Sequence, residues 1–142
     1  MHHRLRNLLG FAGLIPFVSF TLLSAISYSQ HTAVLLLISY GAIILSFMAG
    51  SLWGQAQHDT HSRAGPLIAS NALALSGWAA LYCAVTGWAL LALMGLALAF
   101  ISCWCCERVW LQQEPDYQRL RGVLTSIVVL CLAATSAIVK AN

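Results

Sequence analysis

His58 and His61 form the pattern in this chain that comes closest to a metal site. If their segment is helical, the i, i+3 spacing places both imidazoles on one face, and a zinc ion would need two further ligands. The N-terminal histidines, Cys105 and Cys106 could supply these ligands, but no spacing links them to the pair. A hydrated polar loop accounts for both histidines, so we predict neither a metal ion nor any other cofactor.

A second cluster that could do chemistry is the run Cys103-Trp104-Cys105-Cys106. It is predicted to lie at the cytoplasmic end of a membrane helix, on the reducing side, where disulfides are rare. Cys83 and Cys131 are predicted near the opposite face, where a disulfide between them is an alternative. Cysteine also behaves as a small apolar residue in cores, and we favour this role for all five.

The composition of the chain is that of a membrane protein. Of its 142 residues, 60% are apolar and 8% are charged, whereas a soluble domain is about 45–50% apolar and about 25% charged. So few charged side chains cannot cover a soluble surface, which excludes a soluble enzyme and a disordered chain. The net charge of +3 is also too small for a protein that binds the phosphates of a nucleic acid.

Charged and polar residues divide the chain into stretches long enough to cross a bilayer, for which a helix needs about 20 residues. These stretches are residues 8–27, 32–54, 66–85, 88–105 and 120–139. We therefore predict an all-α fold, an integral membrane bundle of five transmembrane helices forming one domain over residues 1–142. No Asp, Glu, Lys, Arg or His lies away from the ends of these stretches. Pro16 lies inside the first and leaves the Ala12 carbonyl without its usual donor, so we expect a kink there, with Ser19 or a neighbouring helix satisfying the freed group.

The basic residues predict the orientation of the bundle. Five spans place the N-terminus and the connections 55–65 and 106–119 on one side of the membrane. Six of the seven basic residues lie on that side, and Lys140 lies on the other. Because basic residues accumulate on the cytoplasmic side, we predict a cytoplasmic N-terminus and a periplasmic C-terminus in a bacterial inner membrane.

Small residues recur every three or four positions along the second predicted span. Between lipid-embedded helices, small residues allow close packing that larger side chains prevent. We therefore predict a helix-packing stripe on one face and assign Leu45, Met48 and Leu52 on the opposite face to lipid. The stripe consists of Ser39, Ala42, Ser46, Gly50, Trp53 and Gly54.

Arginines and aromatic residues gather around the last predicted connection, on the cytoplasmic side. Such a rim can hold anionic lipid head groups or contact a partner protein. The alternative is ordinary anchoring of the helix ends by arginine and aromatic side chains. The residues of this predicted rim are Arg108, Trp110, Tyr117, Arg119 and Arg121.

The run YGAIILSFMAGSLWG, from Tyr40 to Gly54, resembles the signature of a family of small membrane proteins, the domain of unknown function 3429 family. The segment Gly13–Phe17 and the late residues Tyr117, Leu120-Arg121 and Leu124-Thr125 agree with it. Family members often carry His or Arg immediately before the Trp-Gly pair, where this chain has Leu52. The resemblance implies a membrane bundle and no particular activity.

Without an ionisable residue at membrane depth or a paired acid and base, the sequence does not indicate an enzyme. We expect a non-catalytic accessory or assembly component that lies in the lipid bilayer and docks on a larger membrane complex. Its small-residue faces would contact a membrane-protein partner or a second copy of the chain. The alternative is an oligomeric transporter or channel for an ion or small solute. An enzyme using His58, His61 or the cysteines ranks third.

Overall fold

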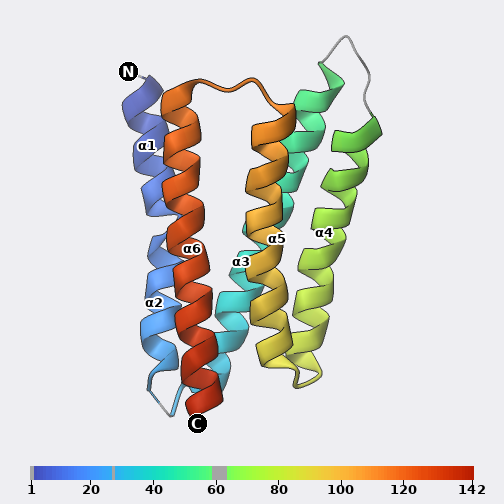
Figure 1. Ribbon diagram of the computed structural model, residues 1–142. Helices are drawn as coiled ribbons and strands as arrows, with labels where there is room; N and C mark the ends of the chain where they lie inside the picture. The colour runs from blue at the N-terminus through green and yellow to red at the C-terminus, as the bar shows by residue number, and fades with distance from the viewer. Residues whose placement is uncertain (1, 27, 59–63) are drawn as a thin grey trace.

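The computed structural model describes residues 2–26, 28–58 and 64–142, and in this part of the chain all regular secondary structure is helical (Figure 1). The helices are α1 (His2–Ala12), α2 (Ile15–Ser24), α3 (Gln30–Gln57), α4 (Ala64–Val85), α5 (Ala89–Trp110) and α6 (Pro115–Ala141). Five segments within these residues are long and apolar enough to cross a membrane, with α1 and α2 together forming the first. The prediction of a five-helix membrane bundle is therefore confirmed.

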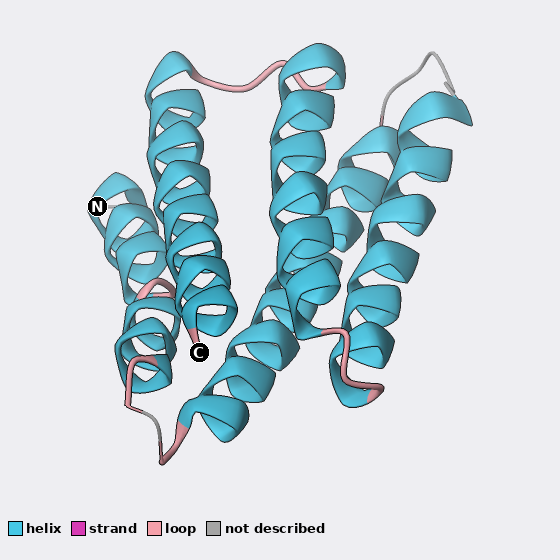
Figure 2. Ribbon diagram, turned by 60° about the horizontal axis from the view of Figure 1, so that its bottom comes forward, coloured by secondary structure: helices cyan, strands magenta, loops and turns pink. Residues whose placement is uncertain are grey.

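The first span is broken, as the proline predicted. Helix α1 ends at Ala12, and α2 begins at Ile15 with Pro16 in its first turn, where the missing N–H is tolerated. Figure 2 shows a short loop at this point. The Tyr40 hydroxyl on α3 donates a hydrogen bond to the Gly13 carbonyl at 3.0 Å. A side chain from a neighbouring helix thus satisfies a backbone group that the break exposes.

Because of this break, the two halves of the first span have different neighbours. Helix α2 packs against α3 and α6, whereas α1 lies mainly against α6 (Figure 1). Helix α3 occupies the centre of the bundle and contacts α2, α4 and α5. On α3, a Cβ atom built on Gly41 would lie 3.6 Å from the Phe17 ring of α2, so the first span reaches this helix through α2.

Helices α3 and α4 lie close together at Gly77. A Cβ atom built on this glycine would lie 3.3 Å from the carbonyl oxygen of Ala42. Two helix turns further along α3, the Ser70 hydroxyl of α4 donates a hydrogen bond to the Ala49 carbonyl. Close packing of small residues and a polar contact between helices together hold this pair.

The predicted lipid-facing side of α3 is wrong, and most of the predicted packing stripe does not face another helix of the described chain. Leu45, Met48 and Leu52, which were assigned to lipid, are buried in the core. Ser46, Gly50, Trp53 and Gly54 are exposed, Ser39 is half-buried, and only Ala42 of the predicted stripe is buried. The central position of α3 explains the difference: its large apolar side chains fill the space between three neighbouring helices. In lipid, an apolar side chain suits either environment, so hydropathy does not distinguish the faces.

Candidate functional site at the α5–α6 end

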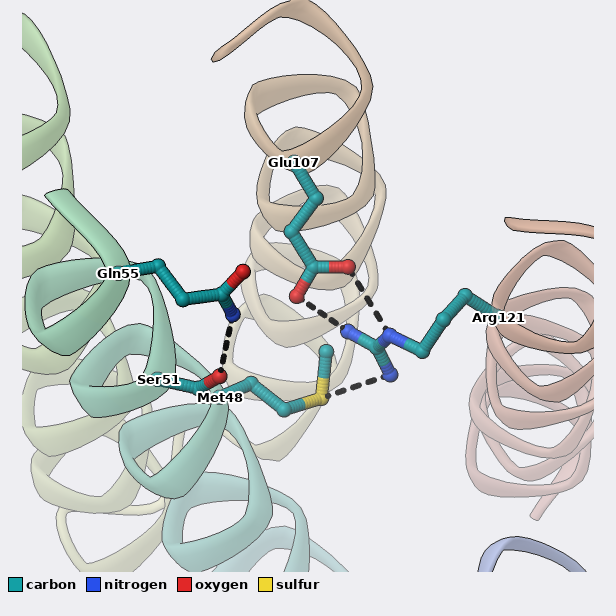
Figure 3. Close-up of polar contacts among 5 residues, drawn as sticks. All are labelled: Met48, Ser51, Gln55, Glu107 and Arg121. Atoms are coloured by element: carbon teal, nitrogen blue, oxygen red, sulfur yellow. Dashed lines mark hydrogen bonds and ion pairs between the residues drawn. The ribbon is translucent and has the colours of Figure 1, made fainter. Parts of the chain in front are cut away.

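The most polar feature inside the bundle is an ion pair between α5 and α6 (Figure 3). Glu107 comes from the last turn of α5, and Arg121 from the second turn of α6. The Arg121 Nε donates to Glu107 Oε2 at 2.9 Å, and Nη2 donates to Oε1 at 2.6 Å. The two side chains are only 5% and 11% exposed. This two-pronged geometry satisfies both carboxylate oxygens and neutralises both charges.

A third contact joins the ion pair to the central helix. Arg121 Nη1 donates to the Met48 sulfur at 3.4 Å, from a position where α3 faces α5 and α6 (Figure 3). Sulfur is a weak acceptor, so this contact adds packing more than hydrogen-bond energy. The three residues nevertheless connect three helices at the same end of the bundle.

Sequence reasoning missed this ion pair and assigned its members elsewhere. Glu107 was placed in a loop and Arg121 on the predicted rim, because both lie at the edges of apolar stretches. Helix α5 continues to Trp110 and α6 begins at Pro115, so both charges lie on helices and face each other. Opposite charges at facing ends of two consecutive spans were the signal that could have revealed the pair.

The residues of the predicted rim do not form one site in the structure but lie in separate contacts. Arg108 and Arg119 line one open pocket of about 690 Å³ on the outer side of α5 and α6. The Arg108 guanidinium lies over the Trp104 ring, 5.0 Å from its centroid, in a cation–π contact. Trp104 belongs to the same pocket, although the sequence analysis named it only within the cysteine run and not in the predicted rim.

The remaining aromatic residues of the predicted rim face other helices. Tyr117 lies under Arg6 of α1, whose guanidinium is 5.1 Å from the ring centroid. Arg6 also forms an ion pair with Glu114 at 3.7 Å. Trp110 packs against α4, where a Cβ on Gly65 would lie 3.3 Å from the indole ring. These contacts fix helix ends, while Arg108 and Arg119 remain exposed.

The histidines and cysteines singled out in the sequence do not converge in the described residues. His58 is exposed at the end of α3, and His61 lies outside the described residues. All five cysteines are free thiols, so the Cys83–Cys131 disulfide considered above is not formed. Cys103 is buried in the core, as expected of a small apolar residue.

Comparison with known proteins decides the family. Residues 3–137 match the family described as "Protein of unknown function (DUF3429)". The chain belongs to this family. The match confirms the resemblance seen in the run from Tyr40 to Gly54 and extends it over nearly the whole bundle.

A relative of this DUF3429 chain is Transmembrane protein 69 of Xenopus tropicalis, which is 36% identical over 135 residues. The match covers 89% of this chain and 51% of the relative, so the chain spans about half the length of the curated relative it matches. No solved structure matches the chain. The similarity therefore covers most of the membrane-spanning part of this chain, and the relative comes from a eukaryote.

Proposed function

We propose that the protein is a non-catalytic accessory or assembly component that docks on a larger membrane complex through its third helix. The docking surface would be the outer α3 face, which we define as Ile43, Ser46, Gly50 and Gly54. All four residues are exposed, and Cβ atoms on Gly50 and Gly54 would meet nothing within 4 Å in the described chain. This uncovered run of small residues on an otherwise central helix is the observation that carries the proposal.

The outer α3 face suits a transmembrane helix of another protein better than it suits lipid alone. Ser46, Gly50 and Gly54 are spaced four residues apart, the arrangement that lets two helix backbones approach closely in a membrane. Helix α1 leans on α6 instead of covering this face. Ser51 and Gln55, which directly follow Gly50 and Gly54, are also exposed, and the Gln55 amide donates a hydrogen bond of 3.1 Å to the Ser51 hydroxyl beside this face. The occupant we propose is therefore a partner helix with small residues of its own.

The Gly50→Leu variant tests this docking without disturbing the bundle. A leucine at this open position has no neighbour to displace within the chain, so the melting temperature in detergent should be unchanged. Its side chain would hold a partner helix away, and we expect recovery of the co-purifying membrane protein to fall about tenfold, equivalent to roughly 1.4 kcal/mol.

Gly95→Leu on α5 is the matched control, because Gly95 is also exposed with nothing within 4 Å of its Cβ position. It should retain the partner at the wild-type level. Equal recovery from both variants would contradict docking through the outer α3 face. A partner that proves to be a second copy of this chain would favour the oligomeric transporter or channel instead.

We propose a cytoplasmic N-terminus and a periplasmic C-terminus, in the inner membrane of a bacterium. Support comes from the six-to-one distribution of basic residues and from the position of the N-terminus and the α5–α6 connection at one end of the bundle (Figure 1). A reporter that is active only outside the cytoplasm should be active when fused after Asn142. Activity from a fusion in the 55–65 connection, with silence after Asn142, would reverse the orientation.

A further inference from the structure

A continuous groove runs along the outer side of α5 and α6 from the helix ends into the membrane. The pocket that contains Arg108 and Arg119 shares Trp104, Gly122 and Ser126 with a second pocket of about 360 Å³. The second pocket extends the lining to Val129 and Leu130. Arg119 and Leu130 are eleven positions apart on α6, about 16 Å along a helix. This length is close to the depth of one leaflet, about half of a 30 Å hydrocarbon core.

The two ends of the groove differ in chemistry. Arg108 and Arg119 are exposed at the mouth, and neither has a carboxylate partner among the described residues. Arg6 and Arg121, by contrast, are each paired with a glutamate. The deeper part is lined by Ile101, Gly122, Val129 and Leu130, which offer apolar contacts and the space left by a glycine. The groove therefore has two arginines without carboxylate partners at its mouth and mainly apolar side chains in its deeper part.

Trp104 supplies a second, independent sign of a ligand. Its indole Nε1 is buried and has no hydrogen-bond partner within the described part of the chain. A buried donor without a partner is costly, and the indole N–H can only donate. Trp104 lies beneath Arg108 and lines both pockets. The Nε1 atom lies 3.6 Å from the position of a Cβ on Gly122, so an acceptor oxygen that enters the groove beside Gly122 would satisfy this N–H.

We infer that the groove, named here the α5–α6 groove, binds one anionic phospholipid from the leaflet at this end of the bundle. The phosphodiester lies between Arg108 and Arg119, which donate charge-assisted hydrogen bonds to its oxygens. An acyl chain follows Gly122 toward Leu130. The proposal concerns α5 and α6, so it does not rest on docking through the outer α3 face.

The test uses the full chain in nanodiscs containing equal parts of phosphatidylglycerol and phosphatidylcholine with the same acyl chains. Native mass spectrometry after release counts the lipids that stay bound. We expect one phosphatidylglycerol to remain in preference to phosphatidylcholine. The double variant Arg108→Gln with Arg119→Gln should lower its retention about tenfold, as expected when charge-assisted hydrogen bonds are lost. Arg4→Gln, which removes an exposed arginine from α1, should leave retention unchanged.

Gly122→Leu separates a built site from general attraction to a basic surface, because it fills the groove and changes no charge. A Cβ here would lie 3.6 Å from the Trp104 ring, an ordinary contact, so the bundle should keep its melting temperature. We expect this variant to lose the lipid as well. Wild-type retention by Gly122→Leu, equal retention of the two lipids, or an equal loss in Arg4→Gln would overturn the proposal.

Discussion

Replacing Arg121 by methionine is expected to destabilise the bundle by about 3–5 kcal/mol, the cost of leaving a buried charge without its partner. Both Glu107 oxygens accept hydrogen bonds from Arg121, and the carboxylate is 5% exposed. Methionine fills a similar length with an apolar chain, so the loss would come mainly from the stranded carboxylate. Reversible unfolding in detergent micelles measures the change.

The double variant Glu107→Gln with Arg121→Met should recover much of this loss, because it removes the stranded charge and leaves a neutral amide. Arg119→Met is the matched control, since Arg119 is exposed and lies two positions away on the same helix. It should change stability by less than about 0.5 kcal/mol. If Arg121→Met and Arg119→Met cost the same, the buried pair does not hold α5 and α6 together.

Gly77→Leu is expected to separate α3 from α4 and to cost about 2–3 kcal/mol, as overpacking of a tight core does. The obstacle is a backbone atom, the Ala42 carbonyl oxygen at 3.3 Å, which cannot move aside as a flexible side chain could. The melting temperature should fall clearly below that of the wild type. Gly50→Leu makes the same substitution in open space and should leave it unchanged. A larger loss from Gly50→Leu than from Gly77→Leu would mean that the faces of α3 are reversed.

The number of spans and the break in the first one could be predicted because each depends on a strong local rule. Stretches of about 20 apolar residues must cross a bilayer as helices, and their backbone groups must be satisfied within it. Pro16 cannot donate within a continuous helix, so the span breaks just before it, and Tyr40 satisfies the Gly13 carbonyl at the break. These constraints act within a single span and are visible in the sequence.

The inward face of α3 could not be predicted because it depends on how many helices surround it. The small-residue rule assumes that close contacts occur wherever glycine and serine align. Helix α3 is instead central, and Leu45 and Leu52 fill its interior sides while Gly50 faces outward. The tight contact is made by Gly77 of α4 against Ala42.

The ion pair escaped prediction for a related reason. Charged residues were used to mark where spans end, which assigned Glu107 to a connection. A helix can continue beyond its apolar stretch. Two opposite charges that neutralise each other can then face the inside of the bundle near the ends of the spans. The predicted rim is not a single site for the same reason: Arg121 faces the interior of the bundle, whereas Arg108 and Arg119 are exposed.

Site-specific photo-cross-linking in intact membranes tests the central proposal most directly. A benzoylphenylalanine placed at position 50 would project from the outer α3 face, and one placed at position 95 would project from α5. We expect a cross-link from position 50 to a different membrane protein and none from position 95. Cross-links to the same polypeptides from both positions, or no protein cross-link from position 50, would contradict it.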